Sequence, residues 1–174
     1  MLSLGAAGCA AVDKAHSIVG HAAAAGPELT VANGYIPDGQ SVSPFANDVP
    51  AIAKLDPDLR AAIQRAARDA AADGVQMGIN SGWRSKRLQQ NLLDEAIRKY
   101  GSKQEAGKWV NTPDKSSHVL GKAVDVGPTD ADSWLSQHGN DYGLCQTYNN
   151  EMWHYELAVA PGDTCPQPLA PDGI

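Results

Sequence analysis

The chain has 174 residues, 43% of them hydrophobic and 20% charged, which is the balance of one ordinary globular domain rather than two. Its formal net charge of -6 at pH 7 excludes a protein that binds nucleic acid through a basic surface, because phosphate contacts need clustered Lys and Arg. No apolar run approaches the roughly eighteen residues of a membrane-spanning helix, so we predict no transmembrane span.

Residues 1–27 are rich in alanine and glycine and lack large apolar anchors, so we interpret them as a tether or the remnant of an export signal. The residues that end in Gly8 and Cys9 resemble the end of a bacterial lipoprotein signal, whose cysteine is lipidated. Ala6 stands where that pattern prefers leucine, and no Lys or Arg precedes the apolar stretch. A lipid anchor at Cys9 and an ordinary tail cysteine both remain open. Residues 28–174 are assigned to one folded domain.

The first half of this domain alternates irregular and regular segments. Residues 29–50 carry several turn signals and predict a surface lead-in with one short strand. Pro57 begins a predicted helix with an apolar face that Gly74 ends. Residues 75–80 alternate apolar and polar side chains, which predicts a strand with one buried face. Ser85 is the expected N-cap of the next helix, which runs to Gly101.

The second half has shorter elements. We predict a short helix over residues 102–110, a strand over 119–126, a turn at 127–130 that leads into a short helix ending at His138, and a strand over 152–159. Residues 161–174 contain four prolines and read as a surface tail. His138 is expected to be an ordinary residue at the C-terminal end of its helix, where the dipole favours it.

Two clusters of polar residues carry the chemistry. His118 and Asp125 form the first, and His154 with Glu151 forms the second. Two imidazoles and a carboxylate are the three protein ligands that a catalytic zinc requires, with the fourth position left to water. The spare carboxylate of Glu151 is the expected general base for that water.

The spacing of these residues sets geometric conditions. His118 and Asp125 are seven apart, so in one regular strand they would point to opposite faces. A bend or bulge near Gly121 must therefore turn one toward the other. Glu151 and His154 are three apart, so Glu151 is expected in the turn before the strand rather than within it.

Three ordered motifs together resemble the VanY-type D-alanyl-D-alanine carboxypeptidases. They are Ser-Gly-Trp-Arg-Ser at residues 81–85, Ser-x-His-x-x-Gly-x-Ala-x-Asp at 116–125 and Glu-x-Trp-His at 151–154. This family belongs to a wider group of zinc peptidases with the lysostaphin-type enzymes and the Hedgehog domain. The resemblance implies a single α+β domain with a central, mainly antiparallel sheet and helices packed on it.

The resemblance also implies a role for each residue of the motifs. His118, Asp125 and His154 would hold one Zn²⁺, and Glu151 would activate the metal-bound water. The residues that would face the substrate are Arg84, Gln89 and Ser116. The implied reaction is hydrolysis of the C-terminal D-alanine of peptidoglycan stem peptides.

Several alternatives stay open on the same fold. The leaving residue could follow a D-residue or an L-residue, so an L,D-carboxypeptidase is one alternative. A cell-wall endopeptidase, a D-Ala-D-Ala dipeptidase and a non-catalytic zinc-containing recognition module are others, although a recognition module has no need of Glu151. We expect a monomer that is exported to the cell envelope or the extracellular space.

Cys145 and Cys165 flank the second cluster, and neither lies in a Cys-x-x-Cys pair. We interpret them as a disulfide, which implies an oxidising compartment. Two unrelated free thiols are the alternative, because pairing cannot be read from sequence.

Overall fold

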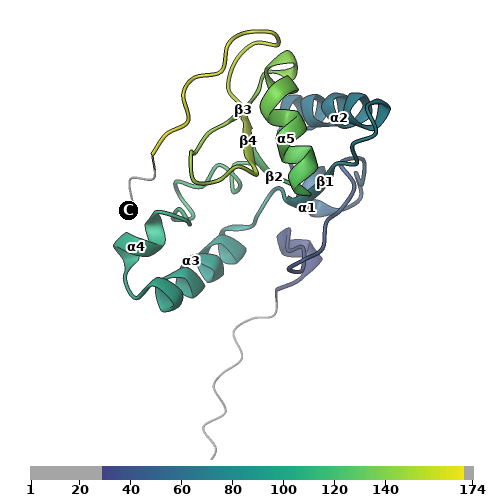
Figure 1. The fold of residues 1–174 in the computed structure, drawn as a ribbon. Helices are drawn as coiled ribbons and strands as arrows, with labels where there is room; N and C mark the ends of the chain where they lie inside the picture. The colour runs from purple at the N-terminus through teal and green to yellow at the C-terminus, as the bar shows by residue number, and fades with distance from the viewer. Residues whose placement is uncertain (1–28, 171–174) are drawn as a thin grey trace, which may run out of the picture.

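The computed structural model describes residues 29–170, so the predicted tether over residues 1–27 and Cys9 lie outside the described residues. The strands are β1 (Gly78–Ser81), β2 (Ala123–Gly127), β3 (Leu144–Gln146) and β4 (His154–Leu157), and they form one antiparallel sheet in the order β1-β2-β4-β3. The helices are η1 (Val31–Asn33), α1 (Pro50–Ala53), α2 (Pro57–Ala72), α3 (Lys86–Tyr100), α4 (Lys103–Gly107), α5 (Thr129–His138) and η2 (Gly139–Tyr142). The expected α+β architecture with an antiparallel sheet is confirmed (Figure 1).

The main core lies between the sheet and helices α2 and α5. Helix α2 begins at Pro57, where the Asp56 side chain accepts a hydrogen bond from Asp58 N, so the predicted start is confirmed. Its apolar face is buried together with the core-facing residues of β1, β2, β4 and α5. The larger of these core residues are Leu59, Ile63, Ile79, Val124, Val126, Trp134, Leu135 and Tyr155. Burial of this apolar face holds the helices on the sheet.

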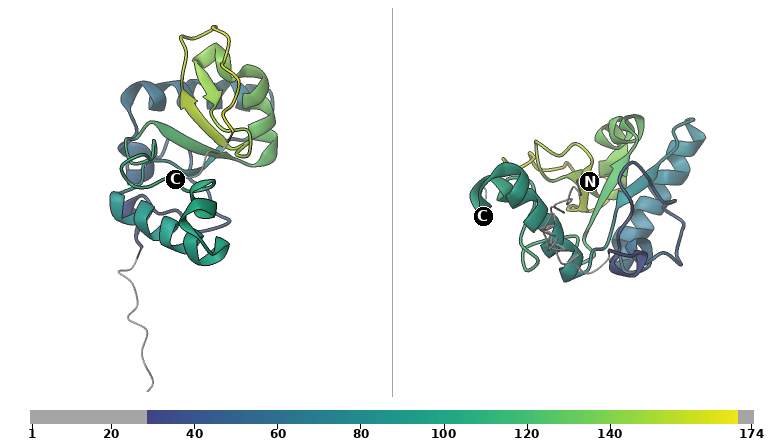
Figure 2. Two further views of the ribbon diagram at one scale, coloured as in Figure 1. Left: turned by 90° about the vertical axis from the view of Figure 1, so that its left-hand side faces the viewer. Right: turned by 90° about the horizontal axis from the view of Figure 1, so that it is seen from below.

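Helices α3 and α4 form a second, smaller layer. Ser85 accepts from Leu88 N and Ser102 accepts from Glu105 N, so each helix begins at a serine cap. The two helices bury their own small apolar cluster around Leu93, Ala96 and Ala106. Both views in Figure 2, with Figure 1, show that the sheet lies between this layer and the α2 and α5 layer.

Three strands are shorter than expected, for reasons that matter to the site. Gly74 has a positive φ of 83° and Val75 N donates to Ala70 O, so the chain leaves α2 through a turn and β1 starts only at Gly78. The strand expected over residues 119–126 begins at Ala123, because residues 116–122 are folded into turns. The strand expected over 152–159 is limited to His154–Leu157.

The residues after β4 run back along the sheet to a fixed end. Cys145 on β3 is bonded to Cys165, with a Cα–Cα distance of 5.6 Å, as the sequence predicted. Beyond this bond Leu169 N donates to Thr147 O at 2.8 Å, and Asn149 N donates to Leu169 O at 3.0 Å. The expected surface tail is therefore fixed at two places. Among residues 29–170, no helix has the length and apolar character needed to cross a membrane.

Removal of the disulfide should destabilise the fold without changing its architecture. The bond closes a sequence separation of 20 residues, and a loop of that size is worth about 3 kcal/mol in the chain-entropy model. The double variant Cys145→Ala, Cys165→Ala should lose about that much free energy of unfolding in urea titrations. The parent chain measured with a reductant is the matched control. Equal midpoints for the oxidised parent and the double variant would contradict this account.

Candidate metal centre and cleft

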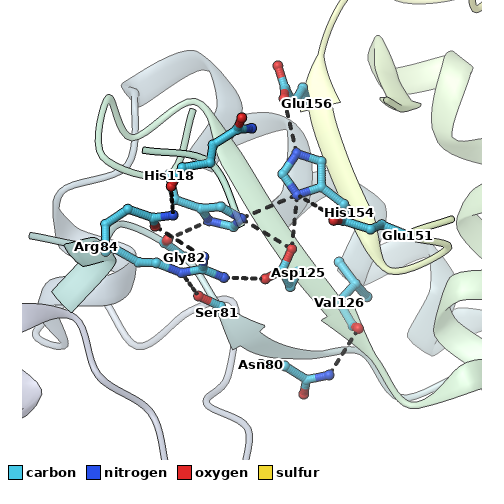
Figure 3. A network of polar contacts seen from close by, with 12 residues as sticks. Asn80, Ser81, Gly82, Arg84, His118, Asp125, Val126, Glu151, His154 and Glu156 are labelled. Atoms are coloured by element: carbon cyan, nitrogen blue, oxygen red, sulfur yellow. Dashed lines mark hydrogen bonds and ion pairs between the residues drawn. The ribbon is translucent and has the colours of Figure 1, made fainter. Parts of the chain in front are cut away.

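Two imidazoles and a carboxylate converge on one point, on one face of the sheet over its two central strands, β2 and β4 (Figure 3). Asp125 Oδ1 lies 3.3 Å from His118 Nε2 and 3.1 Å from His154 Nδ1, and the two nitrogens are 3.3 Å apart. All three side chains are buried. Within residues 29–170 they are the only group of three or more His, Cys, Asp or Glu side chains close enough together to hold a metal ion. The three predicted ligands are thus brought together.

The sheet register brings Asp125 and His154 together. They are directly opposite each other on β2 and β4, and the side chains of such cross-strand partners lie on the same face about 5 Å apart. Their neighbours Val124 and Tyr155 point the other way, into the main core. Core burial on one face therefore fixes which side chains reach the site on the other.

His118 reaches the site from a loop and not from a strand. Gly121 N donates to His118 O, and Gly121 has a positive φ of 72°. A Cβ at this glycine would stand 2.6 Å from Lys54 O, so only glycine permits this close packing on residues 54–56, between α1 and α2. The predicted bend at Gly121 is present, but a bulge in a strand is not needed because His118 lies outside β2.

The hydrogen bonds of the two rings determine where their lone pairs point. His118 Nδ1 lies 2.8 Å from Gly82 O, which can only accept, so this nitrogen carries the hydrogen and Nε2 offers a lone pair. His154 Nε2 lies 3.0 Å from Glu156 Oε1, which leaves Nδ1 toward Asp125. Three electron-pair donors thus face one another. Their separations match the edge of about 3.3 Å of a tetrahedron with zinc-ligand distances near 2.0 Å, so the donor set fits this ion.

The electrostatics of the group agree with a site for a cation. Burial opposes a charge on His154, but hydrogen bonds that its ring donates to the Asp125 and Glu156 carboxylates outweigh this and raise its pKa to about 9. For Asp125, burial is outweighed by His118 and His154, which hold the pKa of this carboxyl well below its usual range. Burial lowers the pKa of His118. A metal ion that binds here displaces the proton that His154 otherwise shares with Asp125.

Glu151 lies beside the three converging donor atoms, in the turn before β4 as predicted. Its Oε2 is 3.7 Å from His154 Nδ1, and His154 N donates to Glu151 O. Burial raises the pKa of Glu151, which is the direction expected of a carboxylate that must accept and then release a proton near neutral pH. Its ion pair with His154 is long, at 3.7 Å, whereas Asp125 pairs with Arg84 at 2.6 Å.

Arg84, Gln89 and Ser116 lie on the same side of the sheet. Arg84 donates through Nη2 to Asp125 Oδ2 at 2.6 Å, through Nε to Ser81 Oγ at 2.7 Å and through Nη1 to Gln89 Oε1 at 3.3 Å. These contacts use three of the five N–H donors of a guanidinium. Gln89 is almost fully buried and donates to Asn111 O. It therefore fixes the orientation of Arg84, a role that its place one helical turn away did not reveal.

A cavity of about 520 Å³ separates the sheet from the α3 and α4 layer. All seven predicted site residues line it, with residues from the end of α4 and with Leu169 and Ala170. A second cavity of about 280 Å³ shares Arg84, Leu92, Asp125 and Trp153 with the first. Its remaining wall includes the lead-in residues Gly34, Tyr35 and Asp38. The guanidinium of Arg84 thus stands between two cavities.

Sequence reasoning missed the residues that support the site. Glu156 holds the outer nitrogen of His154, and the Tyr148 ring lies 5.3 Å from the His154 ring between centroids. The alternation of β4 could have identified Glu156, because it lies two residues from His154 on the same face. Nothing in the sequence pattern could have identified the carbonyl of Gly82 or the approach of Leu169.

Comparison with known proteins gives one consistent result. The family model described as VanY, D-alanyl-D-alanine carboxypeptidase, matches residues 52–161. A D-alanyl-D-alanine carboxypeptidase of Enterococcus faecalis is 32% identical over 111 residues, which cover 49% of this chain and 41% of that protein. The chain therefore spans less than half the length of this relative.

Solved structures of similar proteins agree in fold. The vancomycin resistance D,D-pentapeptidase VanY in complex with Zn(II) is 28% identical with a TM-score of 0.55, over 59% of this chain and 71% of that chain. VanYB in complex with D-alanine-D-alanine is 28% identical with a TM-score of 0.56, over 60% and 72% of the two chains.

Proposed function

Since the chain belongs to the VanY family of D-alanyl-D-alanine carboxypeptidases, we propose that it is an exported zinc carboxypeptidase that removes the C-terminal D-alanine of peptidoglycan stem peptides. The convergence of three lone-pair donors from His118, Asp125 and His154, with Glu151 beside them, carries this proposal. The zinc-bound and D-alanine-D-alanine-bound structures of similar proteins support it. The disulfide agrees with an oxidising compartment.

In this proposal His118, Asp125 and His154 hold the zinc ion. When bound, zinc polarises the scissile carbonyl and lowers the pKa of water. Gly82 O and Glu156 keep the two rings in the tautomers that direct a lone pair inward. Glu151 takes the proton of the attacking water and passes it to the leaving amine, so its carboxylate returns to its starting state.

The residues around the metal centre bind the peptide. Ser116 is buried in the cavity wall, where its hydroxyl can hydrogen-bond the substrate backbone. Arg84 keeps two N–H donors beyond its three contacts, and its planar charge suits a carboxylate. We therefore assign the free C-terminal carboxylate of the substrate to Arg84, which is the feature that makes the reaction exopeptidic.

The assignment of Arg84 predicts a specific loss. An Arg84→Ala variant and a C-terminally amidated substrate should each lower kcat/KM by about ten- to a hundredfold, because a hydrogen bond to a charged group is worth roughly 1.5 to 3 kcal/mol. The two losses should not add, since both remove the same interaction. Mass spectrometry of the products from a defined stem pentapeptide measures both the rate and the residue released.

Arg84→Lys is the matched control, because it keeps the charge beside Asp125 but loses the planar fork. If the parent cleaves amidated and free peptides equally well, Arg84 does not bind the carboxylate, and the result favours a cell-wall endopeptidase. Release of intact D-alanyl-D-alanine would instead identify a dipeptidase.

A further inference from the structure

The end of the described chain forms a wall of the cleft. Leu169 and Ala170 line the 520 Å³ cavity together with His154 and Glu151, although the sequence assigns them to a surface tail. The yellow C-terminal segment in Figure 1 runs down toward α4. Leu169 is 59% exposed, although two backbone hydrogen bonds hold its main chain in place. The position of its backbone is therefore fixed, and its side chain does not belong to the main core.

Leu169 has an apolar counterpart in the same cavity. Trp109, just after α4, is 44% exposed and stacks on Tyr100 with ring centroids 6.0 Å apart. Both large side chains line the cavity that contains the metal centre. Two fixed, partly exposed apolar groups in one concave site are typical of walls that bury the apolar parts of a ligand.

The loop that contains Glu151 is hydrogen-bonded to the segments that carry Leu169 and Trp109. Thr147 and Asn149 are hydrogen-bonded to Leu169 through the backbone. Asn150 Nδ2 donates to Lys108 O at 3.1 Å, which connects the loop to the residue before Trp109. The disulfide between Cys145 and Cys165 fixes the segment four residues before Leu169. The position of the wall is therefore set by the same residues that set the position of Glu151.

The direction of the substrate follows from the two cavities. Arg84, Leu92, Asp125 and Trp153 are shared by both cavities, whereas Leu169, Ala170 and Trp109 line only the larger one. With the C-terminal carboxylate at Arg84, as in the proposed function, the peptide upstream of the scissile bond extends toward Leu169. A volume of about 520 Å³ is that of a site for a drug-sized ligand, far more than one alanine fills.

We propose that Leu169 and Trp109 form a subsite for the aliphatic part of the substrate upstream of the terminal D-alanyl-D-alanine, with Leu169 as a specificity-determining residue. This inference rests on the proposed function. It selects peptides longer than two residues, because a dipeptide does not reach the subsite. It also gives the C-terminal segment a role in substrate binding in addition to its structural contacts.

Binding to zinc-loaded Glu151→Gln protein tests the subsite without turnover. Calorimetry compares a stem pentapeptide that ends in D-Ala-D-Ala with the free dipeptide. Adding Leu169→Ala should raise the Kd of the pentapeptide about tenfold, because apolar burial is lost, and change that of the dipeptide by less than about twofold. Leu169→Met keeps an apolar chain of similar volume and should bind like the parent.

Leu157→Ala is the matched control, because Leu157 is a 39% exposed leucine that lines neither cavity. In otherwise unchanged protein, Leu169→Ala should raise KM for the pentapeptide and leave kcat near that of the parent. The subsite is overturned if Leu169→Ala leaves the Kd of the pentapeptide unchanged, or weakens the binding of both peptides equally. If the parent still releases D-alanine, the proposed function stands. A zinc-loaded parent that neither binds nor cleaves either peptide overturns the proposed function as well.

Discussion

Replacement of Glu151 by glutamine should lower kcat by about a hundred- to ten-thousandfold, which is the usual contribution of a general base. The amide is nearly the same size as the carboxylate but cannot accept the proton of the attacking water. The Oε2 atom of Glu151 lies 3.7 Å from a metal-ligating nitrogen, and burial raises the pKa of its carboxyl. Both observations support the proposal that Glu151 accepts this proton. Rates of D-alanine release from a stem pentapeptide measure the effect.

The Glu151→Gln variant should lose activity but keep its zinc. Zinc content by elemental analysis should remain near one ion per chain, since Glu151 is not one of the three converging residues. Glu95→Gln on α3 is the matched control, because Glu95 lines neither cavity and makes only a 4.0 Å contact with Arg98. Activity of Glu151→Gln within about threefold of the parent would assign the proton transfer to another carboxylate.

The second large effect is expected from His154→Ala, which should remove both zinc and activity. Two remaining donors, His118 and Asp125, would hold zinc far more weakly than three. The substitution also leaves Asp125 without one of the two histidines that hold its pKa down. Elemental analysis after dialysis measures zinc, and peptide hydrolysis with and without added zinc measures activity.

His138→Ala is the control for this loss. His138 lies at the end of α5, where its ring contacts Trp134 with centroids 4.6 Å apart, and it does not belong to the converging group. This variant should keep its zinc and its activity. Unchanged zinc content in His154→Ala would show that the metal is held elsewhere in the chain.

The sequence predicts best where local chemistry decides the structure. The start at Pro57, the cap at Ser85 and the glycine at Gly101 mark helix ends that the structure confirms to within a few residues. The motif residues of the site are also grouped as the resemblance implied. In both cases the type of residue alone supports the prediction: a serine or aspartate can cap a helix with a hydrogen bond, and a histidine or aspartate can offer a lone pair to a metal ion.

What could not be predicted depends on register and on distant contacts. The pairing of Asp125 with His154 comes from the alignment of β2 with β4. The alternation of apolar and polar residues does not determine this alignment, because shifting one strand by two residues keeps the same side chains on the buried face. The strand expected over residues 119–126 was too long, because hydrogen bonds from Gly121 and Lys122 fold the preceding residues into turns. The second role of Gln89, as a partner of Arg84, also becomes visible only when α3 is placed against the sheet.

The opposed positions of Asp125 and His154 have a consequence for stability. The two side chains are already close together before a cation binds, because the backbone pairing of β2 with β4 holds them opposite each other. A zinc ion bound there acts as a cross-link between β2, β4 and the loop of His118, present only in the native state. By mass action, such an ion raises the free energy of unfolding by about 2.7 kcal/mol at a hundredfold excess over its Kd. The zinc concentration around the protein would therefore set its free energy of unfolding.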